Sequence, residues 1–335
     1  MKSIIRNAAA CLVCVVVFCI FFLITGCGSE FEILLHKAPR QSVVYWSEAS
    51  GEISRINPDG TGRRVVITSP GIPLDIAVDS SNDRIFWAEY TGSAYRISRS
   101  EIDGNGLTVF YTTSSSNFGP SAISIDNSNG IIYWNEYQTP GLENNIWYED
   151  VSKSGILVGI KLLRNIVNNY TYAICVDYAD KKIYCTANTY YSIGSPAVAP
   201  AGTGYSGAVY TGHTESTNDA SQVTSLNGPS DPSSPFKGIA VDSECGHVYY
   251  VTNTSHGTWP RNITRTDLNL QNPEVWVYQG VADIQKIAID FQQRKIYWTS
   301  ESDKSIYRAD LDSSNSNVEK FIDLEDSPTG IAILQ

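Results

Sequence analysis

The chain has 335 residues, of which 42% are hydrophobic, 11% are aromatic and only 18% are charged. This composition is typical of a folded globular protein, with too many aromatic residues for a disordered chain and too few charges for a coiled coil. The formal net charge of −11 repels phosphate backbones and argues against nucleic acid as a partner. The length leaves one or two domains open, because all-β architectures of this size also occur as single domains.

The amino terminus has the pattern of an export signal. Lys2 and Arg6 precede an uncharged apolar run from Ala8 to Thr25, and the run leads into Ile24-Thr25-Gly26-Cys27. A basic start, an apolar stretch and small residues before a cleavage site characterise a secretory signal peptide. An ordinary signal peptide and an uncleaved signal anchor are the alternatives to a lipoprotein leader, since the 18 apolar residues lie near the lower limit of about 17 needed to span a bilayer.

The last four residues of this pattern resemble the bacterial lipobox, in which the cysteine thiol is diacylated before the peptide is cut just ahead of it. The resemblance implies a signal peptide over residues 1–26, a lipid on Cys27 and a linker over residues 27–41. More than one acyl chain gives stable membrane attachment. Gly28 follows the cysteine, and by the rules of that family the lack of aspartate there favours the outer membrane or cell surface. We therefore expect a lipid-anchored, extracytoplasmic protein of the cell envelope.

Three cysteines lie beyond the lipobox, namely Cys175, Cys185 and Cys245. Because their number is odd, at most one internal disulfide forms, and the chain is not a disulfide scaffold. A disulfide between Cys175 and Cys185 across a hairpin and a pair of buried free thiols are both compatible with the spacing.

An aromatic doublet, or its remnant, recurs along the chain at intervals of 41, 47, 51, 65 and 48 residues. A β-branched run ending in aspartate precedes the last five doublets, and each aspartate lies seven residues before the first aromatic residue. This fixed spacing indicates a tight two-stranded hairpin whose Asp side chain bonds amides of the turn. The doublets are Tyr45-Trp46, Phe86-Trp87, Tyr133-Trp134, Tyr184-Cys185, Tyr249-Tyr250 and Tyr297-Trp298, and the aspartates are Asp79, Asp126, Asp177, Asp242 and Asp290.

Two further short strands follow each doublet, as in Glu52–Ile56 and Arg64–Ile67. Four short antiparallel strands in about 40 to 50 residues are typical of a propeller blade. The six doublets therefore predict an all-β, six-bladed β-propeller of four-stranded antiparallel blades over residues 42–335. The repeat region enters at a second strand, 42–47, and finishes with a first strand, 328–335. We expect these two segments to pair and close the ring, which removes an open sheet edge.

The repeats resemble a known family. Tyr45-Trp46-Ser47-Glu48, Phe86-Trp87-Ala88-Glu89 and Tyr297-Trp298-Thr299-Ser300, with their Ile-Ala-Val-Asp partners, look like the YWTD repeats of the low-density-lipoprotein-receptor propeller family. The resemblance covers residues 42–335 and implies a six-bladed propeller. The Thr-Asp half of the motif is intact in none of the repeats, and the sequence has no flanking Cys-rich modules. Receptor function therefore does not follow from the resemblance.

The loops of such a propeller differ between its two faces. The turns from first to second strand are short and uniform, whereas long insertions, such as Asn188–Ser206, fall on the opposite face. Variable loops on a rigid scaffold commonly carry binding, and aromatic side chains are frequent contact residues. The candidates for contact with a protein or glycan ligand are Phe118, Tyr137, Tyr190, Tyr191, Tyr205, His256 and Trp259.

Catalytic and metal-binding patterns are weak. In propellers that resemble lactonases a divalent cation binds where the first strands start, and these positions hold Asp75, Ala122, Ala173, Gly238, Lys286 and Gly330. One acid and one lysine do not make an oxygen-rich cage. We therefore expect no metal, no cofactor and no catalytic residues in a monomeric, membrane-anchored propeller that binds protein or glycan. The alternative is an extracytoplasmic hydrolase or lyase whose site the motifs do not reveal.

Overall fold

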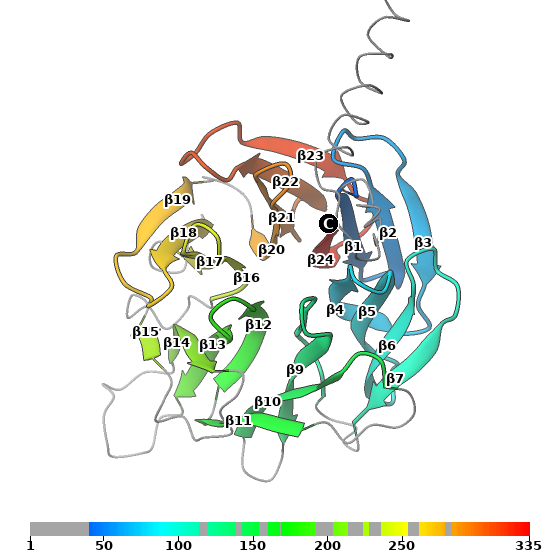
Figure 1. Cartoon of the computed structure of the whole chain (residues 1–335), viewed down its shortest axis with the longest axis horizontal. Coiled ribbons are helices and arrows are strands. Elements are labelled where there is room, and N and C mark those ends of the chain that lie inside the picture. Colours follow the sequence, from blue (N-terminus) through cyan, green and yellow to red (C-terminus); the bar gives the residue numbers. More distant parts are fainter. Residues whose placement is uncertain are drawn as a thin grey trace, which may run out of the picture. The chain divides into compact units, whose positions relative to one another are not determined.

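The computed structural model describes residues 40–113, 119–138, 143–153, 160–167, 169–191, 204–213, 224–227, 236–253, 261–278 and 283–335. The chain divides into two units, residues 1–40 and residues 41–335, and the described strands all belong to the second. These strands form six four-stranded antiparallel sheets, which we number as blades 1 to 6 (Figure 1). No helix in these ranges is long and apolar enough to cross a membrane.

Each blade takes its strands in chain order from the centre outward, except that the innermost strand of blade 1 comes from the far end of the sequence. Blade 1 contains β24 (Pro328–Leu334), β1 (Val43–Glu48), β2 (Glu52–Ile56) and β3 (Arg64–Thr68), blade 2 contains β4 (Ile72–Asp79), β5 (Arg84–Tyr90), β6 (Tyr95–Glu101) and β7 (Thr108–Thr112), and blade 3 contains β8 (Ile123–Asp126), β9 (Ile131–Gln138), β10 (Glu143–Asp150) and β11 (Ile160–Val167). Blade 4 contains β12 (Asn169–Asp177), β13 (Lys182–Tyr191), β14 (Gly204–His213) and β15 (Thr224–Asn227), blade 5 contains β16 (Ile239–Asp242), β17 (His247–Asn253), β18 (Arg261–Asp267) and β19 (Glu274–Tyr278), and blade 6 contains β20 (Ile284–Asp290), β21 (Lys295–Ser300), β22 (Ser305–Asp310) and β23 (Glu319–Asp323).

The ring closes through β24. This strand pairs antiparallel with β1, from Val43 opposite Leu334 to Ser47 opposite Gly330. The innermost strands β24, β4, β8, β12, β16 and β20 contact one another in this order, and β20 contacts β24 again (Figure 1). The prediction of an all-β propeller with four-stranded antiparallel blades, completed by the C-terminal strand, is confirmed.

The aromatic doublets pack the blades against one another. Successive side chains of a strand point to opposite sheet faces, so one residue of each doublet packs toward the preceding blade and the other toward the next. Tyr45 of blade 1 shares a core with Trp87 of blade 2, and Tyr297 of blade 6 shares a core with Trp46 of blade 1. The other shared cores pair Phe86 with Trp134, Tyr133 with Cys185, Tyr184 with Tyr250 and Tyr249 with Trp298. The recurring doublet therefore makes the interfaces between the blades.

The aspartates before the doublets stabilise the first-to-second turns, as the spacing predicts. Asp126 Oδ1 accepts hydrogen bonds from the amides of Ser128 at 2.9 Å and Asn129 at 3.1 Å. The turn ends at Gly130, whose φ of 65° lies in the left-handed region that glycine adopts without strain.

The same aspartates also join neighbouring blades. Asp177 Oδ1 accepts a hydrogen bond of 2.7 Å from Ser243 Oγ of blade 5, and Asp290 Oδ2 accepts one of 2.6 Å from Ser42 Oγ, next to blade 1. These contacts support the structural role expected for the five carboxylates.

Cys175 and Cys185 lie on opposite faces of the β12–β13 hairpin. Cys175 is opposite Tyr184 in the register, whereas Cys185 is opposite Ile174. Cys175 accordingly packs in the core between blades 4 and 5, and Cys185 packs in the core between blades 3 and 4. Cys175, Cys185 and Cys245 are all free thiols, so the hairpin contains no disulfide.

This arrangement predicts selective alkylation. Burial raises the pKa of the Cys175 thiol well above its ordinary value and that of Cys185 to about 12, whereas Cys245 is exposed. Because the thiolate is the reactive form, iodoacetamide should modify Cys245 in the folded chain and reach Cys175 and Cys185 only after denaturation. Peptide mass spectrometry measures each site separately. Equal modification of Cys175 and Cys245 without denaturant would contradict the buried placement.

Candidate functional site

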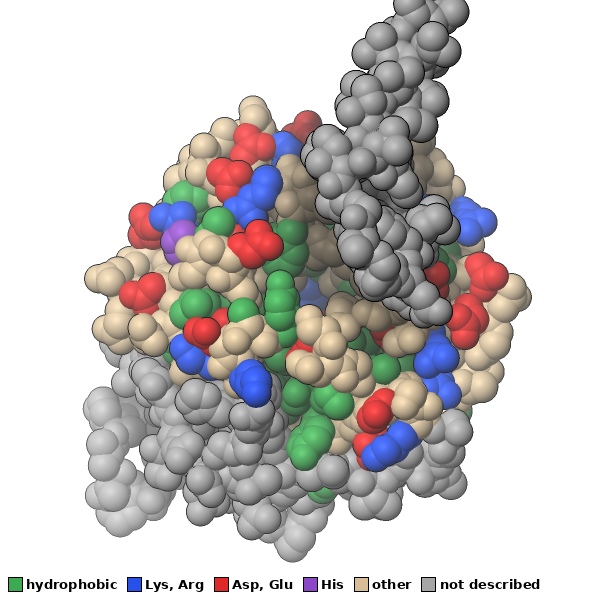
Figure 2. Space-filling view, viewed as in Figure 1, with side chains coloured by type: hydrophobic (Ala, Val, Ile, Leu, Met, Phe, Trp, Pro, Cys, Tyr) green, Lys and Arg blue, Asp and Glu red, His purple; other side chains and the backbone are tan. Residues whose placement is uncertain are grey.

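The connections between strands lie on two faces of the ring, because consecutive strands are antiparallel. We call the face with the first-to-second turns the turn face, and the face with the second-to-third and interblade connections the loop face. The central channel has a mouth on each face. The cavity at the turn-face mouth has a volume of about 460 Å³, and the cavity at the loop-face mouth has a volume of about 360 Å³. Figure 2 shows hydrophobic side chains gathered beside the central hollow of the ring.

The sequence-predicted ligand residues are only partly within the described chain. Tyr137 lies in β9, Tyr190 and Tyr191 lie in β13, and Tyr205 lies in β14, each at the loop-face end of its strand. The remaining candidates, Phe118, His256, Trp259 and the lipidation site Cys27, lie outside the described residues.

The prediction that Tyr137, Tyr190, Tyr191 and Tyr205 belong to loops is wrong. Tyr190 is opposite Tyr205 in a continuous register that ends with Tyr191 opposite Gly204. Strands β13 and β14 have ten residues each, whereas β1 and β2 of blade 1 have six and five. Residues 188–206 are rich in Gly, Ala, Ser and Pro, which is typical of a loop, but backbone pairing extends the hairpin across both ends of this segment.

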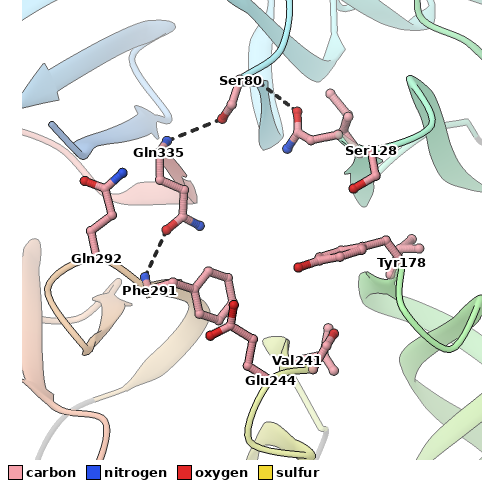
Figure 3. Close-up of a pocket in the computed structure, with 12 residues that line it drawn as sticks. Ser80, Ser128, Tyr178, Val241, Glu244, Phe291, Gln292 and Gln335 are labelled. Atoms are coloured by element: carbon pink, nitrogen blue, oxygen red, sulfur yellow. Dashed lines mark hydrogen bonds between the residues drawn. The ribbon is translucent and has the colours of Figure 1, made fainter. Parts of the chain in front are cut away.

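The turn-face mouth is built by the residue that follows each turn aspartate. Gln335 takes the equivalent place in blade 1, after β24 (Figure 3). The side-chain Oε1 of Gln335 accepts a hydrogen bond of 2.9 Å from the backbone amide of Phe291, and the backbone amide of Gln335 donates one of 3.4 Å to Ser80 Oγ. The residues of this ring are Ser80, Asn127, Tyr178, Ser243, Phe291 and Gln335.

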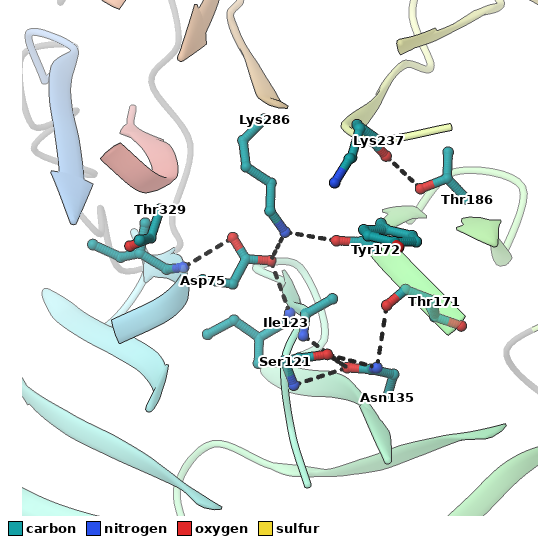
Figure 4. Close-up of polar contacts among 12 residues, drawn as sticks. Asp75, Ser121, Ile123, Asn135, Thr171, Tyr172, Thr186, Lys237, Lys286 and Thr329 are labelled. Atoms are coloured by element: carbon teal, nitrogen blue, oxygen red, sulfur yellow. Dashed lines mark hydrogen bonds and ion pairs between the residues drawn. The ribbon is translucent and has the colours of Figure 1, made fainter. Parts of the chain in front are cut away.

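An ion pair crosses the loop-face mouth. Lys286, at the start of β20, places its Nζ 2.9 Å from Asp75 Oδ2 of β4 and donates a 2.7 Å hydrogen bond to the carbonyl of Tyr172 in β12 (Figure 4). These three strands belong to blades 6, 2 and 4, no two of which are neighbours in the ring. Lys286 therefore connects separate parts of the mouth.

Asp75 is the buried partner of this pair. It is 6% exposed, and its carboxylate also accepts hydrogen bonds from the amides of Ile76 at 3.1 Å and Ile123 at 3.2 Å. Burial raises the pKa of Asp75, although the Lys286 ammonium and the amide donors oppose the rise. The one acid at the predicted metal position is thus paired with a cation of the chain itself, and no three His, Cys, Asp or Glu side chains form a metal site within the described ranges.

A second lysine lies at the same mouth. Lys237 Nζ is 4.2 Å from the centroid of the Tyr172 ring, a cation–π contact. Thr186 Oγ1 donates a hydrogen bond to the Lys237 carbonyl. The sequence did not single out Tyr172 and Lys237, whereas the equivalent repeat positions of Asp75 and Lys286 placed both residues at one mouth of the channel.

The residues that replace Thr-Asp in the repeat motif form hydrogen bonds to the segments that connect strands on the loop face. Asn135, at the Thr position of blade 3, accepts hydrogen bonds from the amides of Ser121 at 3.0 Å and Ala122 at 2.7 Å. Its side-chain Nδ2 also donates to Ser121 Oγ at 2.9 Å. The start of β8 is thereby fastened to β9 (Figure 4).

Buried glutamates occupy the Asp position of three repeats. Glu48 accepts hydrogen bonds from Trp46 Nε1 at 2.8 Å and from the amide of Asp326 at 2.9 Å. Glu136 accepts hydrogen bonds of 2.5 Å from both Tyr111 and Thr113. A buried carboxylate needs such partners. These glutamates therefore stabilise the ends of the strands at the loop face, and Glu48 and Glu136 do not line either channel mouth.

Comparisons with known proteins show the fold. No family model and no curated protein sequence matches this chain. A chain of the nidogen/laminin complex is similar in structure, with a TM-score of 0.63 and 14% identity over 88% of this chain and 98% of that chain. TolB from Acinetobacter baumannii has a TM-score of 0.63 and 10% identity over 88% of this chain and 66% of its own, and the putative TolB from Agrobacterium tumefaciens has a TM-score of 0.59 and 11% identity over 86% and 90%.

At these identities the similarity shows a β-propeller and nothing finer. The expected resemblance to a YWTD-type propeller is confirmed at the level of the fold by the nidogen/laminin structure. The two TolB structures show that the same architecture is shared with a second group of propellers.

Proposed function

We propose that this chain is a non-enzymatic binding protein that presents the loop face of its propeller to a protein or glycan partner. The observation that carries the proposal is the loop-face mouth, where the polar side chains are held in place before any partner arrives. Lys286 is fixed by Asp75 and by the Tyr172 carbonyl. A site held in this way loses little side-chain freedom on binding.

The loop-face mouth offers hydrogen-bond donors to a partner. An ammonium group has three N–H donors, and Lys286 uses two of them on described acceptors. Ser121, Gln285 and Thr329 add hydroxyl and amide groups to the lining. Peptide carbonyls and sugar hydroxyls are the acceptors that such a lining suits.

The long β13–β14 hairpin adds a second contact element on the same face. Tyr190 and Tyr191 follow the part of β13 that pairs with β12, because that register starts at Thr189 opposite Asn169. Tyr205 is opposite Tyr190 in the hairpin. Tyrosine side chains contribute strongly to protein and sugar contacts. A similar propeller occurs in a complex of nidogen with laminin, which supports a protein partner for this fold.

The proposal includes the compartment that the amino terminus indicates. Residues 1–26 would be the signal peptide, Cys27 the lipidated residue and 27–41 the linker to a six-bladed propeller over 42–335, on the outer membrane or cell surface. The 14 residues between Cys27 and Ser42, as a flexible linker, span on the order of 20 Å, so the propeller would lie close to the membrane. Loss of membrane association on Cys27→Ser would support the lipid anchor.

Replacing the end of the hairpin tests the binding face. Thr189 and Ser206 are opposite one another, so an Asn-Gly turn in place of residues 190–205 removes Tyr190, Tyr191 and Tyr205 and can close the hairpin without straining the strands. We expect this variant to lose at least about tenfold in affinity for partners captured from glycan arrays or envelope extracts, because each tenfold step needs only about 1.4 kcal/mol of lost contacts.

The matched control shortens the same blade on the opposite face. Thr211 is opposite Thr224, so replacing residues 214–223 by Asn-Gly leaves a four-residue connection, a length that also joins hairpin strands. This turn-face variant should bind as the unmodified chain does. Equal losses in both variants, or no loss in either, would count against binding at the loop face.

A further inference from the structure

The turn-face mouth has the features of a second binding site, at the other end of the channel from the proposed partner site. Its cavity of about 460 Å³ lies within the range of roughly 300 to 1,000 Å³ usual for small-molecule pockets. Tyr178 is 48% exposed there, although tyrosine rings are usually covered. Figure 3 shows Tyr178 and Phe291 reaching toward the cavity from different blades, with Glu244 beside it.

Several polar side chains of this lining are not used by the fold. Asn127 bonds to Ser80 and Val78, and the Ser243 hydroxyl bonds to Asp177. By contrast, the Tyr178 hydroxyl, the Glu244 carboxylate and the side chains of Ser128 and Gln292 form no hydrogen bond within the described chain. These groups are available to a ligand.

The lining of the cavity carries a negative charge. Among the described residues of the lining, Glu244 is the only charged side chain, and none is a lysine or an arginine. The five turn aspartates lie one residue before the lining ring, and among the described contacts only Asp242 has an ion pair, with Arg294 at 3.0 Å. Arg294 is also paired with Asp312 at 2.6 Å. Uncompensated carboxylates around a concave site favour cations and repel anions.

We propose that the turn-face mouth binds an organic cation, an ammonium group carried on a small apolar body. The aromatic side chains of Tyr178 and Phe291 attract the cation and cover its apolar substituents, and Glu244 supplies the opposite charge. Ile125, Val176 and Val241 form the apolar part of the lining. The site is independent of the loop-face proposal, since the two cavities share no lining residue.

Choline and its neutral isostere test the role of the charge. In dimethylbutanol a tert-butyl group replaces the trimethylammonium group, so the two probes match in shape and differ in charge. Calorimetric titration of the full chain should show saturable binding of choline and at least about tenfold weaker binding of dimethylbutanol, as expected when a desolvated cation–π contact is lost. Butylammonium should also bind if the site accepts a primary ammonium such as a lysine side chain, whereas binding of choline alone assigns the site to quaternary ammonium ligands.

Three variants test the position of the site. Glu244→Gln and Tyr178→Ala should each weaken choline binding by about tenfold or more, because they remove the charge and an aromatic wall. Glu301→Gln, an equivalent charge change in the loop-face lining, should leave choline binding unchanged. Unaltered thermal melting of each variant would show that the fold is intact.

Equal affinity for choline and dimethylbutanol would overturn the proposal, as would saturable binding of a neutral sugar such as glucose in the absence of choline binding. The proposal would also be wrong if Glu244→Gln and Tyr178→Ala bound choline as the unmodified chain does. Loss of choline binding in Glu301→Gln would move the cation to the opposite mouth and equally reject this assignment.

Discussion

A chain that lacks residues 328–335 should lose its cooperative unfolding transition. Strand β24 is the innermost strand of blade 1 and pairs with β1 at six residue positions. Ile331 lies in the core between blades 6 and 1, and Leu334 lies in the core between blades 1 and 2. Each buried side chain contributes about 1.5 to 3 kcal/mol, and the deletion also leaves an unpaired edge on β1. The sum approaches a total stability of about 5 to 15 kcal/mol.

Thermal unfolding followed by tryptophan fluorescence measures this effect, because Trp46 packs directly in one of the two disrupted cores. Deletion of Gln335 alone is the matched control and should lower the melting temperature only slightly, since it leaves β24 intact. Ile331→Ala should lie between the two, with a loss of about 2 to 5 kcal/mol. A truncated chain that melts at the same temperature as the full chain would show that β24 is not needed for closure.

Lys286→Met should destabilise the propeller more than removal of its partner does. The substitution leaves Asp75, 6% exposed, without its cation, and breaking a buried ion pair in this way costs about 3 to 5 kcal/mol. Asp75→Asn should cost about 1 to 3 kcal/mol, because the single amide oxygen still accepts from the amide of either Ile76 or Ile123, and Lys286 keeps its hydrogen bond to the Tyr172 carbonyl. The double variant should recover most of the loss seen with Lys286→Met.

The pH dependence of the unfolding free energy shows whether the Asp75 charge causes the destabilisation of the Lys286→Met variant. Burial raises the pKa of Asp75 in the folded chain, and without the ammonium nothing of opposite charge opposes this rise. A carboxyl group with a raised folded-state pKa favours folding when protonated, so the penalty should be small below the unfolded-state value of about 3.9 and should grow as pH rises through the folded-state pKa. Urea unfolding near pH 4 and near pH 7 measures the difference. An equal penalty at both values would exclude the Asp75 charge as its origin.

The repeat made most of the fold predictable from the sequence. The constant distance between aspartate and doublet marks a hairpin, and its recurrence marks the blades. The complementary ends, 42–47 and 328–335, indicated the closing strand, and β1 and β24 pair as expected. Local spacing was sufficient here because each blade is built from strands that are close in sequence.

The candidate site was less predictable because its residues meet only in the ring. Asp75 and Lys286 are 211 residues apart, and their repeat positions predicted a shared mouth but not the direct contact between them. Tyr172 and Lys237 carry no motif at all. Tyr190 and Tyr205 were expected in a loop because the residues around them are mostly small or polar. Their strands are instead held by backbone pairing between β13 and β14, which the side-chain pattern does not reveal.

The composite blade also sets the order in which this protein can mature. A chain is synthesised from its amino end, so β1 is made early and remains without β24 until nearly the whole repeat region has been synthesised. Until residue 334 is present, the cores on both sides of blade 1 lack Ile331 and Leu334. Final assembly of the ring must therefore follow the synthesis and release of its last strand.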